Sequence, residues 1–253
     1  MSEFENKTAV VTGASRGIGA AAAVALAQAG IGRVVVHYGS HRQGAEETAA
    51  RVREAGADAE TIGADLSTMA GIRNFLEEMK RTSPPADILI NNAGSLVKRA
   101  RLAEYTPELF DTVMTLNVKS AYLIAQAVAP HMIEQGNGAI VNLGSIAGRN
   151  GGGPGSTIYA AAKAAIAAMT KGLAKELAPQ GVRVNAVSPG TVDNHFHAVF
   201  STKESLAAMT AATPAGRLGT NEEIADVIVF LCSGASRYIH GQTIEINGGM
   251  LMV

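Results

Sequence analysis

The sequence has one cysteine, no tryptophan and almost no net charge, and these shortages exclude several classes of protein. The single cysteine, Cys232, cannot form a disulfide within the chain, which favours a reducing compartment. A formal net charge of -1 gives no electrostatic basis for binding nucleic acid or an anionic membrane. Aliphatic runs such as 228–232 are much shorter than a membrane span, and residues 1–7 lack an apolar signal core. We therefore expect a soluble, cytoplasmic protein.

The chain also lacks linkers and repeats, so its 253 residues are expected to form a single domain over 1–253. Short apolar runs typical of buried strands alternate with longer helical patterns. The predicted strands are 8–12, 33–38, 59–62, 87–91, 138–143, 182–188 and 243–246. The predicted helices are about 17–29, 41–55, 68–80, 107–135, 157–178 and 221–232. This alternation predicts an α/β fold with a doubly wound, seven-stranded parallel sheet.

One long connection, from Pro189 to Pro214, has few periodic signals, and we interpret about 189–214 as a substrate lid. A glycine-rich turn, 12–19, lies between the first strand and an alanine-rich helix. Gly13 suits a tight turn, Gly17 a close approach to a phosphate, and Gly19 close packing of the helix on the sheet. The N–H groups at the start of the helix would face those phosphates. The spacing, G-x3-G-x-G, differs from the standard dinucleotide fingerprint, but its position after the first strand favours nucleotide binding over an ordinary turn.

Tyr159 and Lys163 lie four residues apart on a predicted helix and therefore share one face. A cation beside a phenol stabilises the phenolate and lowers its pKa, which provides a proton donor and acceptor near neutral pH. Ser145, in an earlier loop, offers a hydroxyl to the same site. The alternative is a tyrosine at a helix start with a lysine that extends its stem along an alanine-rich helix.

Together these features resemble the short-chain dehydrogenase/reductase family in its compact, single-domain branch. Further motifs that carry the resemblance are Asn91-Asn92-Ala93-Gly94, Asn117 and Pro189-Gly190. The resemblance implies a Rossmann-type fold and hydride transfer between a nicotinamide and a small carbonyl or alcohol substrate. General similarity is greatest to 3-oxoacyl-carrier reductases and to glucose-type dehydrogenases. One position departs from the family: Asn194 stands where many relatives have a threonine that contacts the nicotinamide carboxamide.

The resemblance also implies roles for individual residues. Tyr159 would exchange the proton with the substrate oxygen, Ser145 would stabilise that oxygen, and Lys163 would lower the tyrosine pKa and hold the nicotinamide ribose. Asn117 would hold a water between Lys163 and solvent, or would only bond a neighbouring backbone carbonyl. Asp65 would accept from the adenine amino group, or would cap the helix that starts near Ser67. The other expected cofactor contacts are Gly13, Ser15, Arg16, Gly17, Ile18, Gly19, Leu66, Asn91, Ala93, Gly94, Pro189, Gly190 and Val192.

The end of the second strand favours NADP(H) over NAD(H), although NAD(H) stays open. NAD-selective folds place an acidic residue there, but no Asp or Glu occurs between Val35 and Glu46. Arg16 in the glycine turn is expected to reach a 2′-phosphate from one side. Arg42 or His41 would approach it from the other side, and Ser40 would donate a hydrogen bond.

Three other functions compete with this interpretation. A serine hydrolase is disfavoured because Leu143 occupies the first glycine position of G-x-S-x-G around Ser145. A metal site at His195 and His197 is disfavoured because no recognised ligand spacing accompanies them, so no metal is expected. A cofactor-sensing protein without catalysis is disfavoured because the serine, tyrosine and lysine are all present. NAD(P)H oxidation with a panel of carbonyl compounds separates these functions.

The sequence specifies the substrate and the assembly less closely. Lys98, Arg99 and Arg101 are candidates to attract an anionic substrate or carrier, although a solvated loop is the favoured interpretation. Phe196 and Phe200 would cover an apolar substrate or pack on the core. The helix 159–178 is apolar nearly all round, which predicts burial on both sides. We therefore expect an oligomer, with a homotetramer favoured, in which this helix and 107–135 lie at a two-fold interface.

Overall fold

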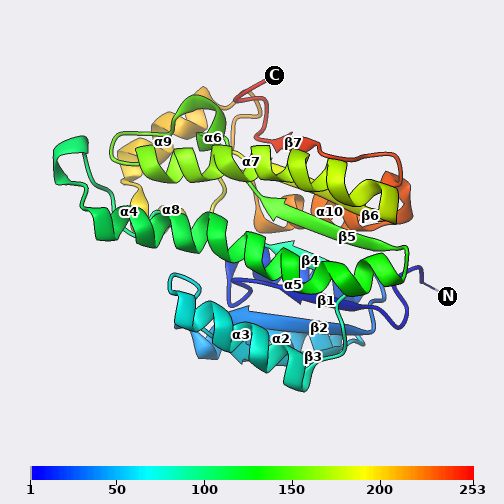
Figure 1. Cartoon of the computed structure of the whole chain (residues 1–253). Coiled ribbons are helices and arrows are strands. Elements are labelled where there is room, and N and C mark those ends of the chain that lie inside the picture. The colour runs from blue at the N-terminus through cyan, green and yellow to red at the C-terminus, as the bar shows by residue number, and fades with distance from the viewer. Residues whose placement is uncertain (1) are drawn as a thin grey trace.

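Seven parallel strands form one sheet in the order β3-β2-β1-β4-β5-β6-β7 in the computed structural model, which describes residues 2–253 (Figure 1). The strands are β1 (Thr8–Val11), β2 (Arg33–Tyr38), β3 (Asp58–Gly63), β4 (Ile88–Asn91), β5 (Gly138–Leu143), β6 (Val182–Pro189) and β7 (Thr243–Ile246). The helices are α1 (Gly17–Gln28), α2 (Arg42–Glu54), α3 (Met69–Thr82), α4 (Pro107–Met114), α5 (Ser120–Glu134), α6 (Ala147–Asn150), α7 (Thr157–Leu177), α8 (His195–Phe200), α9 (Lys203–Ala212) and α10 (Asn221–Cys232).

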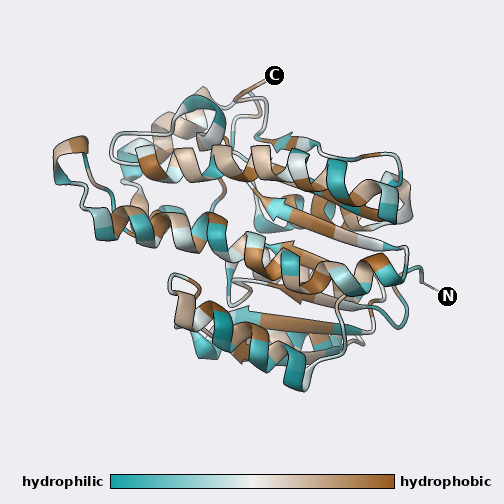
Figure 2. Cartoon of the chain, in the orientation of Figure 1, coloured by the Kyte–Doolittle hydropathy of each residue, from teal (hydrophilic) through white to brown (hydrophobic). Residues whose placement is uncertain are grey.

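Alternate residues of each central strand face opposite layers of helices, because successive side chains of a strand point to opposite faces. Val11 of β1 packs with the buried residues of α1, α2 and α10. Its neighbour Val10 packs with those of α3, α5 and α7, the layer nearest the viewer in Figure 1. Both faces of the sheet are therefore covered, and Figure 2 shows hydrophobic residues along the central strands.

The strand order reverses between β1 and β4. The chain runs from β1 outward to β3 and then returns to the other side of β1 to form β4. In open α/β sheets the crevice at such a point, outside the carboxyl ends of the strands, is where ligands bind. The glycine turn after β1 and the motif after β4 flank this crevice.

The predicted doubly wound sheet is confirmed, and three strands and one helix have the predicted bounds: 33–38, 138–143, 243–246 and 221–232. The prediction for 107–135 needs correction, because a π-helical turn, Thr115–Lys119, separates α4 from α5. The connection 189–214 is also more ordered than its weak periodicity indicated, since it contains α8 and α9. Within residues 2–253, no helix combines the length and the apolarity that crossing a bilayer requires.

Candidate active site

The glycine turn adopts a backbone that depends on its glycines. Gly13 and Gly17 have φ values of +64° and +60°, a region that L side chains rarely adopt. A Cβ on Gly13 would lie 2.9 Å from the Cα of Ala93, and one on Gly19 would overlap the side chain of Asn92. The N-cap residue of α1, Arg16, gives no side-chain hydrogen bond to the first turn of the helix. The start of α1 is thus left to bind an anion through its N–H groups.

Asn92, directly after β4, ties the glycine turn to the β4 loop. Its Nδ2 donates to the carbonyl oxygens of Thr12 and Gly13, at 2.8 and 2.9 Å. In return, the Thr12 hydroxyl oxygen accepts from the N–H groups of Asn92 and Ala93, both at 3.0 Å. These four bonds fix the two walls of the crevice relative to one another. The motif Asn91-Asn92-Ala93-Gly94 contains this residue, but the sequence analysis predicted cofactor contacts only for the other three.

His37, near the end of β2, holds the same turn from the other side. The Gly13 N–H donates to its Nδ1 at 3.0 Å, and its Nε2 lies 3.0 Å from the carbonyl oxygen of Ala64. The ring is 2% exposed and packs edge-on against Phe75, with a centroid distance of 4.8 Å. Burial lowers the pKa of His37 to about 4, partly offset by its bond to Ala64. The imidazole is therefore neutral at pH 7, with Nε2 as the donor and Nδ1 as the acceptor.

Ser145, Tyr159 and Lys163 come together at the carboxyl end of β5 and on the first turns of α7. The Tyr159 hydroxyl lies near Ser145, whose hydroxyl lowers the pKa of the phenol. The Lys163 Nζ donates to the carbonyl oxygen of Leu143 at 2.7 Å and lies 5.7 Å from the centroid of the Tyr159 ring. The Ser145 hydroxyl oxygen also accepts from the Ala147 N–H at 3.1 Å. The serine is thus directed at a phenol, which is not the arrangement of a serine hydrolase.

The pKa values of this group differ from the sequence-based expectation. Burial raises the pKa of Tyr159 to about 12, although the Ser145 hydroxyl offsets part of the rise. Burial lowers the pKa of Lys163 to about 8. In the protein groups alone, burial of the phenol therefore determines the Tyr159 pKa, and the lowering expected from Lys163 stays a prediction.

Asn117 lies within the π-helical turn and supports the site from behind. Its Nδ2 donates to the carbonyl oxygens of Ser95 and Val113, each at 2.8 Å, and its Oδ1 accepts from the Ser95 N–H at 3.2 Å. A Cβ on Gly94 would lie 2.6 Å from that Oδ1 and 3.0 Å from the Lys163 Nζ. Asn117 is buried and does not line the cleft. Its bonds to backbone carbonyls match the structural alternative, and they place it beside Lys163.

A cleft of about 980 Å³ joins the glycine turn to Ser145, Tyr159 and Lys163. The predicted residues that line it are Gly13, Ser15, Arg16, Gly17, Ile18, Ser40, His41, Asp65, Leu66, Ala93, Gly94, Ser145, Tyr159, Lys163, Pro189, Gly190 and Val192. Gly19 lies under the turn, where it is buried. Asp65 accepts from the Ser67 N–H and hydroxyl, at 2.9 and 2.7 Å, while Thr68 caps α3. The alternative that Asp65 caps this helix is therefore wrong, and its contact with adenine stays a prediction.

Besides Gly19, two predicted cofactor contacts lie outside the cleft. Asn91 is the last residue of β4, and its side chain points to the sheet and α5, where it donates to Asn142 Oδ1 at 2.9 Å and to the Ala121 carbonyl at 3.2 Å. Arg42 is exposed on α2 and lies 3.8 Å from Glu46. The predictions for Asn91 and Arg42 are corrected accordingly. Consecutive residues at a strand end face opposite ways, so the cleft receives Asn92 instead of Asn91.

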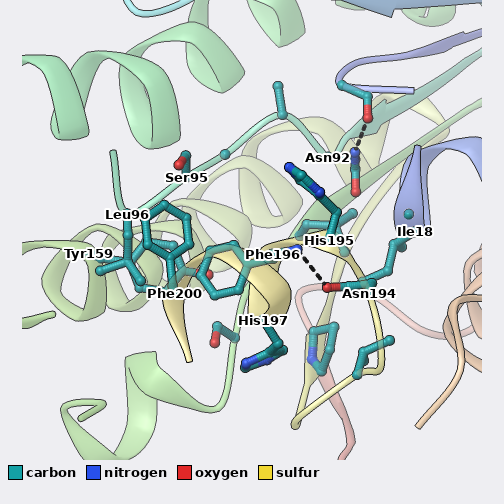
Figure 3. Close-up of a pocket in the computed structure, with 18 of the residues that line it drawn as sticks. Ile18, Asn92, Ser95, Leu96, Tyr159, Asn194, His195, Phe196, His197 and Phe200 are labelled. Carbon is teal, nitrogen blue, oxygen red and sulfur yellow. Dashed lines mark hydrogen bonds between the residues drawn. The ribbon is translucent and has the colours of Figure 1, made fainter. Parts of the chain in front are cut away.

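The connection 189–214 covers the tyrosine with aromatic side chains. Phe196 packs between Tyr159 and Phe200, with ring centroid distances of 5.7 and 5.0 Å (Figure 3). Asn194 caps α8, since its Oδ1 accepts from the Phe196 N–H at 3.1 Å. Its Nδ2 donates to Asn221 Oδ1 on α10 at 3.2 Å. Asparagine at this position therefore connects α8 to α10.

Comparisons with known proteins agree with this geometry. A family profile described as "Enoyl-(Acyl carrier protein) reductase" matches residues 13–251. The 3-oxoacyl-acyl-carrier-protein reductase FabG of Staphylococcus aureus is 36% identical over 246 residues, which cover 97% of this chain and 98% of that protein. The chain belongs to the short-chain dehydrogenase/reductase family. It is an oxidoreductase of that family, acting on a CH–OH or C=O group with a nicotinamide cofactor.

Solved short-chain dehydrogenase/reductase structures share the whole fold. An NADH-dependent reductase, A1-R', described as responsible for alginate metabolism, superposes with a TM-score of 0.90 at 32% identity and covers 100% of both chains. A protein described as a putative NAD(P)-dependent gluconate 5-dehydrogenase from Beutenbergia cavernae, with bound NADP, has a TM-score of 0.89 at 37% identity, over 98% of this chain and 97% of that one.

Proposed function

We propose that the protein catalyses NADP(H)-dependent hydride transfer to and from a small carbonyl compound, with Tyr159 as the proton donor. The observation that carries the proposal is the grouping of Ser145, Tyr159 and the buried Lys163 in one cleft with the glycine turn, with the Lys163 Nζ 5.7 Å from the centroid of the Tyr159 ring. The glycine turn suits the pyrophosphate of a dinucleotide, and so does the start of α1, where no side chain caps the N–H groups. When bound, the nicotinamide supplies or accepts the hydride.

The protein groups control position and protons. In the reductive direction Tyr159 donates its hydroxyl proton to the carbonyl oxygen as negative charge develops there, and Ser145 donates a hydrogen bond to the same oxygen. Lys163, with a pKa of about 8, is mostly charged at pH 7 and supports the phenolate that forms. Asn117 is a positioning residue, because its bonds to Ser95 hold the β4 loop beside the lysine. The aromatic lid over Tyr159 limits the access of water.

The preference for NADP(H) rests on the residues beside the end of β2. Arg16, Ser40 and His41 line the cleft, and no acidic residue follows β2 before Glu46. An arginine and a hydroxyl suit a 2′-phosphate, whereas NAD(H)-selective folds carry a carboxylate there. NAD(H)-dependent sugar or alcohol oxidation is the second candidate, favoured by the likeness to an NADH-dependent reductase.

Dissociation constants for NADPH and NADH separate the two candidates. The wild type is expected to bind NADPH at least about tenfold more tightly, and Arg16→Ala is expected to remove most of that difference. Arg42→Ala is the matched control, because it deletes an arginine outside the cleft. Equal affinities in the wild type, or a loss of both cofactors alike in Arg16→Ala, would contradict the preference.

The substrate proposal extends only to its class. The relatives support either a 3-oxoacyl thioester or a sugar-derived carbonyl compound. NADPH oxidation measured with both classes decides between them, and an absence of oxidation with every carbonyl compound tested would favour the cofactor-sensing alternative.

We also propose a homotetramer in the cytoplasm. Three alanines of α7, at 161, 164 and 168, are exposed, and Phe110 and Tyr122 on the neighbouring α4 and α5 are 44% and 46% exposed. Small side chains permit close approach of a second helix, and burial of the two aromatic rings would favour it. Light scattering at micromolar concentration is expected to give the mass of an oligomer, and a monomer mass would contradict this. The cytoplasmic location rests on the single, buried Cys232.

A further inference from the structure

Arg99 is held inside the cleft by two backbone carbonyls. It lies on the loop between β4 and α4, where its Nε donates to the carbonyl oxygen of Phe200 at 2.8 Å and its Nη1 donates to that of Pro154 at 2.9 Å. It therefore connects the end of the lid helix α8 to the loop before α7. Its neighbours Lys98 and Arg101 are exposed and do not line the cleft. Of the three basic residues on this loop, only Arg99 belongs to the site.

The backbone that presents Arg99 is strained. Val97, two residues earlier, has a φ of +61°, which is an outlier for a β-branched residue. The Lys98 N–H donates to the Leu96 carbonyl across it at 2.7 Å, which closes a tight γ-turn. The Val97 N–H is fixed by the Ser95 hydroxyl at 2.9 Å. Strain of this kind persists where the surroundings enforce it, and it is concentrated at functional sites.

Arg99 has no carboxylate partner among residues 2–253, since none of the ion pairs there includes it. The one acidic residue that lines the cleft, Asp65, follows β3 and bonds to Ser67. His197, on α8, is neutral at pH 7, because burial and the charge of Arg99 lower its pKa, an effect that Asp193 partly offsets. A guanidinium has five N–H donors, and the two carbonyls use two of them. A half-buried cation with free donors beside an aromatic wall suits an anionic group of a ligand.

We propose that Arg99 binds a carboxylate of the substrate, so that the enzyme acts on small keto acids or hydroxy acids. This inference rests on the proposed function, because it places the carboxylate of that substrate on Arg99 and its carbonyl carbon under Tyr159. Phe196 and Phe200 connect Tyr159 to Arg99. The Phe196 ring packs on Tyr159 and on the Phe200 ring, and the carbonyl oxygen of Phe200 accepts from Arg99. The hydrocarbon part of the substrate would lie against these rings, with its carboxylate on the guanidinium.

The test compares keto acids with their methyl esters, which keep the carbonyl and remove the charge. Pyruvate, acetoacetate, levulinate and 5-oxohexanoate, each with its ester, are assayed by NADPH oxidation in wild type, Arg99→Gln and Lys98→Gln. The wild type is expected to favour at least one acid over its ester. In Arg99→Gln the value of kcat/KM for that acid falls about ten- to a hundredfold relative to the ester, whereas Lys98→Gln keeps the wild-type ratio.

The ratio of acid to ester separates charge recognition from a looser lid, because loss of the bond to Phe200 affects both compounds. An unchanged ratio in Arg99→Gln would overturn the proposal. A 3-oxobutyryl thioester of phosphopantetheine and its dephosphorylated form are assayed in parallel. If Arg99→Gln weakens only the phosphorylated thioester, the arginine reads a carrier phosphate and the carboxylate proposal is wrong.

Calorimetric titration of the same acids keeps this inference distinct from the proposed function. Binding of an acid that depends on Arg99, without NADPH oxidation, would support the carboxylate site and contradict the proposed reaction. Oxidation of NADPH by neutral ketones and acids alike, unaffected by Arg99→Gln, would support the reaction and contradict the carboxylate site.

Discussion

Acidification is expected to destabilise the glycine turn through His37. Its imidazole must stay neutral, because Nδ1 accepts from the Gly13 N–H and cannot do so when protonated. The pKa falls from the ordinary value of 6.5 to about 4 on folding. The stabilising contribution is therefore fully present above pH 6.5 and is lost progressively as the pH falls towards 4. At 1.36 kcal/mol per pKa unit, about 2 kcal/mol of the free energy of unfolding is lost between pH 7 and pH 5.

The assay is urea unfolding at pH 7 and pH 5, at one protein concentration, for wild type and His37→Asn. Asparagine offers one acceptor and one donor but does not titrate, so the variant keeps the chemistry of both hydrogen bonds without the pH dependence. Other titrating groups are common to both proteins and cancel in the comparison. The wild type is expected to lose about 2 kcal/mol more than the variant on acidification. His37→Gln serves as a second variant that does not titrate. If either variant lost as much unfolding free energy between pH 7 and pH 5 as the wild type, the reasoning would be refuted.

Three further variants test the site. Tyr159→Phe keeps the ring against Phe196 but removes the proton, so turnover should fall at least about a hundredfold while the Kd for NADPH is unchanged; near-normal turnover would exclude the role. Gly94→Ala places a Cβ 2.6 Å from Asn117 Oδ1 and 3.0 Å from Lys163 Nζ, so kcat should fall about tenfold or more, and wild-type kcat would contradict the geometry. Asn92→Ala removes two bonds to the glycine turn, so thermal unfolding should show a loss of about 1–3 kcal/mol with weaker NADPH binding; an unaltered Kd would show that the turn does not need them.

The sheet could be predicted from the sequence because its strands are buried on both faces. Runs such as 138–143 are apolar or small apart from Asn142, and all six residues there are buried. The helices α8 and α9 were missed because short helices such as α8 have too few residues to show a period. Their start signals were present: Asn194 and Thr202 each accept a hydrogen bond from an N–H in the first turn. The π-helical turn carries no signal that periodicity can detect.

The residues of the cleft could be predicted where backbone geometry or a reacting group requires a residue type. Gly13, Gly17 and Tyr159 meet that condition. His37 was missed because a histidine in an apolar strand resembles any buried residue, and its partners come from β1 and β3 segments far away in the chain. Arg99 was interpreted as one of three solvated charges, since the bonds that distinguish it go to backbone carbonyls of residues 154 and 200. Every residue has a backbone carbonyl, so the sequence does not show which distant carbonyls an arginine will bind.

The most direct test of the account is the fate of the hydride. NADPH deuterated at the transferable position of nicotinamide C4 is incubated with the enzyme and a carbonyl substrate, and the alcohol product is analysed by mass spectrometry. The account predicts one deuterium on the carbinol carbon with the wild type, and loss of nearly all product with Tyr159→Phe. Product that lacks the label, or labelled product formed at the wild-type rate by Tyr159→Phe, would contradict hydride transfer with Tyr159 as the acid.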